Sequence, residues 1–170
     1  MRQRIVELRA RCKNIAVVRK RLLEIGARSL DVFCQVDTYF NVPNGEMRLS
    51  VINGGKGILV YRPQEHTGSA SEVFLTEIRN PGELAALLKA ALGIKCVVHR
   101  TREAYSWRDT SIYLDKISGL GGFVELQAKV SEGGEEKAPA LLEALQRLGI
   151  SEASLIRKSY SELIEEKSGL

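Results

Sequence analysis

The feature that most constrains the fold of this chain is an alternation of ionic and apolar side chains along several extended segments. A strand points successive side chains to opposite faces, so every second residue shares a face. In residues 2–12 the apolar face holds Val6, Leu8, Ala10 and Cys12, and the ionic face holds Glu7, Arg9 and Arg11. Residues 121–130 repeat the pattern, with Val124, Leu126, Ala128 and Val130 on one face and Phe123, Glu125, Gln127 and Lys129 on the other.

The chain contains enough such segments to close a sheet on itself. Alternation and turn signals predict eight strands, at 2–12, 28–40, 46–53, 56–63, 71–78, 94–107, 110–118 and 121–130. Helical periodicity predicts three helices, at 14–25, 81–92 and 138–148, each followed by a glycine. A chain of 170 residues suits one domain. We therefore expect an α+β fold, a closed eight-stranded antiparallel β-barrel with about three covering helices, in one domain over residues 1–170.

Two orientations of the ionic faces are possible. Strands commonly point polar residues at water, which would leave the charges on the outside. Alternatively, the three helices cover the apolar faces from outside, and the ionic faces line the interior. The candidate inner residues are the cations Arg9, Arg11, Arg48, Arg62, Arg100, Arg102 and Lys129, and the carboxylates Glu7, Asp115 and Glu125. An enclosed excess of cations is costly unless anions fill it.

This set of side chains suits a phosphate ligand. The planar guanidinium of arginine grips phosphate oxygens in pairs, so we expect the seven cations to bind phosphates. A few carboxylates beside them would hold a hard cation such as Mg²⁺ or Mn²⁺, which bridges phosphate oxygens. The interior is therefore predicted to bind a polyphosphate, with Glu7, Asp115 and Glu125 as candidate metal ligands and catalytic residues.

Several runs along the chain resemble the CYTH superfamily, the triphosphate tunnel metalloenzymes that include class IV adenylate cyclases and thiamine triphosphatases. The resemblance covers about residues 3–163. It rests on Ile5-Val6-Glu7-Leu8-Arg9, Gln35 to Phe40, Arg48-Leu49, Tyr61-Arg62, Arg100-Thr101-Arg102 with Tyr105, the run from Leu114 to Gln127, and Lys158-Ser159-Tyr160. The resemblance implies a tunnel that binds ATP, thiamine triphosphate or tripolyphosphate, and it suggests a homodimer.

Two positions depart from the family pattern. Ile5 stands where the family has the first glutamate of its first strand, and Gln127 stands where it has the second glutamate of a later strand. Each departure removes a carboxylate, so two hypotheses stay open. The chain is either a metal-dependent cyclase or triphosphatase, or a binding module that kept its phosphate clamp and lost catalysis.

Composition narrows the setting. Three cysteines are too few and too widely spaced for a disulfide framework or a metal motif, and the sequence has no apolar run long enough to span a membrane. We therefore expect a cytoplasmic protein without a membrane partner. A third hypothesis is a barrel that contacts RNA through outer basic residues such as Arg2 and Lys20. It is the least favoured, because these residues lack interleaved aromatics and match no nucleic-acid-binding motif. The loop at 63–71 is expected to help select the organic part of the ligand.

Overall fold

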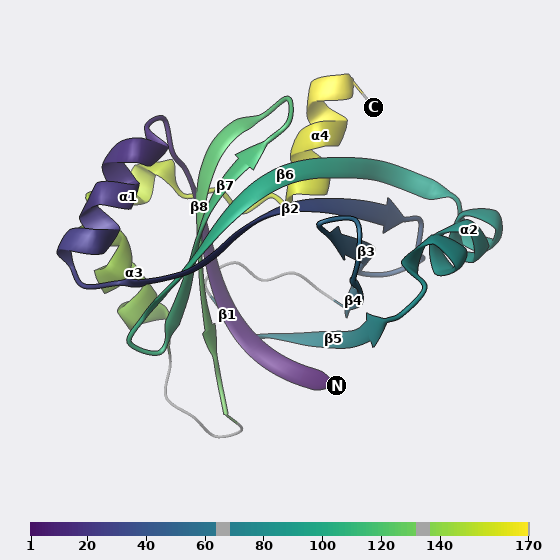
Figure 1. Ribbon diagram of the computed structural model, residues 1–170, viewed down its shortest axis with the longest axis horizontal. Helices are drawn as coiled ribbons and strands as arrows, with labels where there is room; N and C mark the ends of the chain where they lie inside the picture. Colours follow the sequence, from purple (N-terminus) through teal and green to yellow (C-terminus); the bar gives the residue numbers. More distant parts are fainter. Residues whose placement is uncertain (64–68, 132–136, 170) are drawn as a thin grey trace.

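Eight antiparallel strands close into a barrel in the computed structural model, which describes residues 1–63, 69–131 and 137–169 (Figure 1). The strands are β1 (Arg2–Arg11), β2 (Arg28–Phe40), β3 (Glu46–Ile52), β4 (Gly57–Arg62), β5 (Ser71–Ile78), β6 (Ile94–Trp107), β7 (Thr110–Ile117) and β8 (Gly121–Lys129). Around the barrel they follow the order β1-β5-β4-β3-β2-β6-β7-β8. The predicted α+β barrel is confirmed. The central part of the predicted specificity loop, residues 64–68, lies outside the described residues.

The pairing of β1 closes the barrel and sets its register. This strand pairs with β5 along its first half and with β8 along most of its length. Glu7 lies opposite Gln127, and Arg9 lies opposite Glu125. Because facing residues in an antiparallel pair point to the same side of the sheet, these four side chains share one face.

The apolar face of β1 points outward, toward two helices. Val6, Leu8 and Ala10 are buried in one core cluster with Leu22 of α1 (Ile15–Glu24) and Leu145 of α3 (Ala138–Arg147). Figure 1 shows α1 and α3 together against one side of the barrel. This outer core turns the ionic faces of the strands toward the interior, as predicted.

A fourth helix, in addition to the three predicted ones, closes one end of the barrel. The chain continues through a short 3₁₀ turn (Glu152–Ser154) to α4 (Tyr160–Ser168), where Ser159 and Glu162 form a capping box. Tyr160 and Leu163 pack against Tyr39 and Phe123, whose strand positions face inward. These residues form a plug at one end of the interior. An open cavity lies beyond the ionic residues, on the side of the interior away from this plug.

The helix α2 (Pro81–Leu92) contacts β2 and β3, but it is only partly buried. Helical spacing puts Leu84, Leu87 and Leu88 on one apolar stripe; Leu84 and Leu88 are half-buried, whereas Leu87 is 61% exposed. Figure 1 shows α2 at an end of the molecule, remote from α1 and α3. Within the described parts of the chain, no helix combines the length and apolar character needed to cross a membrane.

Candidate functional site

Buried ion pairs link β1 to β8 inside the barrel. Arg9 donates from Nη2 to Glu7 at 2.6 Å and to Glu125 at 3.2 Å, so one guanidinium joins both carboxylates. Arg62 from β4 donates to the other oxygen of Glu7 at 3.0 Å. Gln127 Nε2 also donates to both carboxylates, to Glu7 at 2.7 Å and to Glu125 at 3.0 Å. The two glutamates are therefore tied together by N–H donors.

A second group of ion pairs centres on Asp115 of β7, which is fully buried. Arg102 grips both of its oxygens, at 2.7 and 2.6 Å, in the paired geometry that gives arginine–carboxylate bonds their strength. Arg102 also reaches Glu125 at 3.1 Å, which joins this group to the first. The hydroxyl of Tyr160 donates to Asp115 at 2.8 Å, and its ring lies 4.5 Å below the guanidinium carbon of Arg9. The plug thus contacts the ionic residues directly.

Asp37 of β2 is a member of this site that the sequence reasoning missed. It is fully buried, accepts a hydrogen bond from Gln35 at 2.7 Å and another from Ser50, and lies 2.6 Å from Arg100 as an ion pair. The signal was present, because Gln35, Asp37 and Tyr39 occupy alternate positions of one strand. This alternation puts the side chain of Asp37 on the inward face of β2.

The structure brings most of the predicted site residues together. We call the following set the ionic layer: Glu7, Arg9, Asp37, Arg48, Arg62, Arg100, Arg102, Asp115 and Glu125. Two predicted cations lie outside it. Arg11 is exposed at the plugged end, with its guanidinium 5.3 Å from the Phe123 ring. Lys129 is exposed at the opposite end, where it lines the mouth of the interior with Gln127 and Tyr113.

An open cavity of about 280 Å³ lies beside the ionic layer, on the side away from the plug. Arg48, Arg62 and Arg102 line it together with Gln127. The buried Nε of Arg48 has no hydrogen-bond partner, although buried N–H groups are nearly always paired. Three guanidinium groups on the lining of one cavity suit an anion.

The electrostatics of the layer favour charged glutamates. Burial alone would raise the pKa of Glu7, but the positive charges of Arg62 and Arg9 outweigh burial and hold the pKa below its ordinary value of 4.5. Burial would also raise the pKa of Glu125. The positive charges of Arg102 and Arg9 outweigh this effect, so the pKa of Glu125 is strongly lowered. Burial and the nearby Asp115 raise the pKa of Tyr160. The glutamates are therefore anions and the tyrosine is neutral at physiological pH.

The carboxylates suit a metal only in part. Among the described residues, no group of three or more His, Cys, Asp or Glu side chains could hold a metal ion, and Asp115 is engaged by Arg102 and Tyr160. Glu7 and Glu125 together offer two carboxylates whose oxygens could act as metal ligands. Such a pair fits a cation that takes its remaining ligands from phosphates and water, as Mg²⁺ commonly does.

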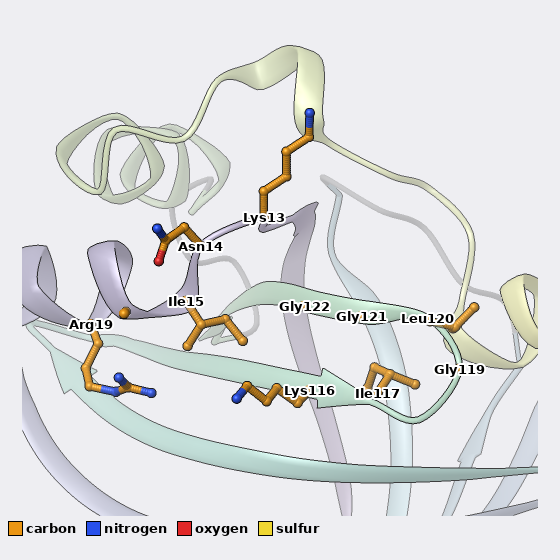
Figure 2. A pocket seen from close by; sticks show the side chains of 11 residues that line it. Lys13, Asn14, Ile15, Arg19, Lys116, Ile117, Gly119, Leu120, Gly121 and Gly122 are labelled. Carbon is orange, nitrogen blue, oxygen red and sulfur yellow. The ribbon is translucent and has the colours of Figure 1, made fainter.

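A further hollow of about 680 Å³ lies between the start of α1 and the turn that joins β7 to β8 (Figure 2). Lys13 and Lys116 line it and are exposed, and Arg19 is bound to Glu103 through two hydrogen bonds of 2.8 and 2.5 Å. These charges are solvated or paired, in contrast to the enclosed arginines of the ionic layer. The barrel interior is therefore the stronger candidate site.

Comparison with known proteins agrees with this geometry. The model of the CYTH domain matches residues 3–160, almost the whole chain. The chain belongs to the CYTH family. A candidate adenylate cyclase of Methanocaldococcus jannaschii is 26% identical over 170 residues, which cover 93% of this chain and 97% of that protein.

Solved structures share the fold of this CYTH domain. A protein of Pyrococcus horikoshii OT3 superposes with a TM-score of 0.84 at 23% identity, covering 94% of this chain and 98% of that one. A candidate adenylyl cyclase from Hippeastrum, described as having a dominant triphosphatase activity, gives a TM-score of 0.63 at 17% identity, covering 98% and 96%. At these identities the likeness concerns the fold alone.

Removing the hydroxyl of Tyr160 should loosen the contact between the plug and the ionic layer. We expect Tyr160→Phe to lower the free energy of unfolding by about 1–2 kcal/mol, because buried Asp115 loses a donor. Urea denaturation measures the change. The control is Tyr61→Phe, whose hydroxyl donates to the Asn44 carbonyl at the exposed surface and should cost less than about 0.5 kcal/mol. Equal losses in the two variants would contradict the proposed contact.

Acid should destabilise the CYTH domain through its buried glutamates. The pKa values of Glu7 and Glu125 lie below 4.5 in the folded protein, so their charged forms stabilise it above that pH. This stabilisation is lost as the pH falls below 4.5, the ordinary pKa of a glutamate, toward the lower pKa values of the folded protein, because the buried glutamates must then be protonated. The free energy of unfolding should therefore decrease from about pH 5 to about pH 3, as measured by denaturation. Glu125→Gln should make that decrease shallower, and an unchanged slope would count against the assignment.

Proposed function

We propose that this CYTH domain binds a small molecule bearing a triphosphate inside its barrel, beside the ionic layer. The observation that carries the proposal is the cavity lined by Arg48, Arg62 and Arg102. Three guanidinium groups on one small cavity match the several oxygens of a polyphosphate chain. Lys129 at the mouth would attract the anion as it enters.

The carboxylates of the layer would hold the arginines ready for the ligand. Glu7 fixes Arg9 and Arg62, and Asp115 fixes Arg102 in a two-point grip. Fixed side chains lose little entropy when the phosphates arrive, which favours binding. We assign Asp115 a positioning role for Arg102, since both of its oxygens are engaged. Arg11 is exposed at the plugged end of the barrel, so we assign it no role in phosphate binding.

Turnover would use the same residues. Glu7 and Glu125 would hold Mg²⁺ or Mn²⁺ together with phosphate oxygens. When bound, such a cation neutralises charge on the phosphates and polarises them toward attack. Arg62 and Arg102 would stabilise the negative charge that spreads over the transferred phosphoryl oxygens. Attack by water would release phosphate, and attack by a ribose hydroxyl would release pyrophosphate and a cyclic nucleotide. The names of the Methanocaldococcus and Hippeastrum proteins support these two chemistries.

A second candidate function is polyphosphate binding without turnover. It is favoured by the N–H groups of Arg9 and Gln127, which already occupy the facing oxygens of Glu7 and Glu125. A cation would have to displace these donors. In this case the barrel would sequester or sense a polyphosphate.

We also propose that the protein works in the cytoplasm, because all three of its cysteines are free. The expectation of a homodimer stays a prediction. Size-exclusion chromatography with light scattering would measure the number of chains directly.

Tripolyphosphate should bind to the wild-type protein, and the affinity should fall with rising salt, because the contacts are ionic. Arg48→Gln should weaken binding about 10- to 100-fold, since it removes a charged donor from the cavity. Isothermal titration calorimetry measures both effects. The matched control is Arg147→Gln on the exposed face of α3, which should leave the affinity unchanged. Absence of wild-type binding would refute the proposed function.

Gln127→Glu should separate the enzyme from the binding module. The change replaces a donor between Glu7 and Glu125 with a third carboxylate, so it should strengthen metal binding. Wild type and variant would be incubated with ATP, thiamine triphosphate and tripolyphosphate in Mg²⁺ or Mn²⁺, and phosphate, pyrophosphate and cyclic AMP would be quantified. An enzyme turns over at least one substrate as wild type. A binding module shows no turnover as wild type. It gains a rate about tenfold or more above the background without protein only in Gln127→Glu or in its combination with Ile5→Glu.

The control for this experiment is Gln146→Glu, the same substitution at an exposed position of α3. It should behave as wild type. If the wild-type protein and both Gln127 variants are equally inert while tripolyphosphate still binds, missing metal ligands do not explain the lack of catalysis.

A further inference from the structure

One wall of the barrel interior is apolar. We call it the apolar wall, and it consists of Ile5 of β1, Ile52 of β3, Ile58 and Val60 of β4, and Val73 and Leu75 of β5. All six side chains line the same cavity of about 280 Å³ that Arg48, Arg62 and Arg102 line. The cavity therefore combines a cationic part with an aliphatic wall, and the neutral side chains of Gln3, Gln35 and Ser50 lie at the edge of that wall.

The apolar wall combines a small buried cluster with side chains that are only partly buried. Ile5, Val60 and Val73 form a cluster separate from the outer core under α1 and α3 and from the plug at α4. Ile58 and Leu75 are only partly buried, although their strand positions face inward. Aliphatic side chains that face an open cavity leave apolar surface in contact with water, which is unfavourable until an apolar group covers it.

The two parts of the cavity are adjacent. Val60 lies opposite Arg48 in the β3–β4 pair and two positions from Arg62 along β4. Alternate residues of a strand are about 7 Å apart, so one small ligand can reach both. Ile5 also lies close to cationic groups, because it lines both the cavity and the mouth, where Lys129 lies.

We propose that the organic part of the ligand is a compact hydrocarbon group, so that the preferred ligands are triphosphate esters of short branched or unsaturated carbon chains. This inference rests on the proposed function, since the arginines must hold the phosphates. The apolar wall then covers the hydrocarbon, and Ile5 acts as a specificity residue. A glutamate at that position would place a charge within the wall.

The size of the cavity sets the size of the group. Small-molecule pockets usually measure about 300–1,000 Å³, so a cavity of about 280 Å³ is at the lower limit. Because the phosphates on the arginines occupy part of the same cavity, only a short hydrocarbon, on the order of five carbons, fits beside them.

The test is a series of synthetic ligands that share the phosphates and differ in the organic group. Isothermal titration calorimetry would compare tripolyphosphate, methyl triphosphate, 3-methylbutyl triphosphate and ribose 5-triphosphate. Affinity should rise about three- to fourfold with each methylene, so that 3-methylbutyl triphosphate, with four more carbons, binds at least about 80-fold more tightly than methyl triphosphate. Its heat-capacity change on binding should also be more negative, which marks the burial of apolar surface.

A pair of variants links the effect to the apolar wall. Val60→Thr combined with Val73→Thr keeps the shape of the wall but adds hydroxyls, and should weaken 3-methylbutyl triphosphate binding about tenfold while leaving tripolyphosphate unchanged. The matched control is Val97→Thr, the same substitution at a side chain that is 39% exposed on β6, which should change neither affinity.

Each outcome bears on one claim. Equal affinity for the 3-methylbutyl and ribose esters, with tripolyphosphate still bound, overturns the inference and leaves the proposed function standing. Loss of binding for every triphosphate overturns the proposed function itself. If the double variant fails to fold, the ligand series and the heat-capacity change on the wild-type protein still decide the inference.

Discussion

The enclosed pairing of guanidinium and carboxylate groups is the interaction on which this structure depends. Isolated charges are expensive inside a protein, and they are tolerated here because each carboxylate of the layer faces at least one arginine. The network also links strands that are distant in the sequence, since Arg9 joins β1 to β8 and Arg62 joins β4 to β1. Replacing one partner would leave the other charged and buried, so the network constrains the barrel as a unit.

The charge balance of the interior bears on what can enter it. Five arginines face four carboxylates in the ionic layer, which leaves one positive charge in excess. A triphosphate carries more negative charge than that excess neutralises. It must therefore displace carboxylates from their arginines or bring a cation with it. The mouth residue Lys129 offers one more charge.

Much of the barrel and of its inward ionic face could be predicted, because both follow from alternation within single strands. Three features could not. Alternation along β2 places Asp37 on the inward face, but it does not reveal the partners Ser50 and Arg100, which come from other strands. Arg11 follows the inward pattern but lies at the plugged end, beside Phe123. The helix α4 carries a recognisable capping box, yet the burial of Tyr160 depends on Asp115 of β7, a contact between distant parts of the sequence.

The predicted apolar stripe of α2 illustrates the opposite error, because periodicity indicates a helix but not what covers it. Leu87 is exposed although its spacing resembles that of the buried leucines of α3. A stripe is buried only where the chain topology delivers a facing surface, and α1 and α3 have one because the apolar faces of β1 and β8 turn toward them.

The double pairing of β1 has a consequence for biosynthesis. Its register with β8 runs from Ile5 opposite Lys129 to Arg11 opposite Phe123, so β1 acquires this neighbour only after all the other strands of the barrel have been made. Until then its ionic and aliphatic faces both remain accessible. Closure of the barrel is consequently a late event in synthesis, and the nascent chain exposes an unpaired edge of the kind that chaperones recognise.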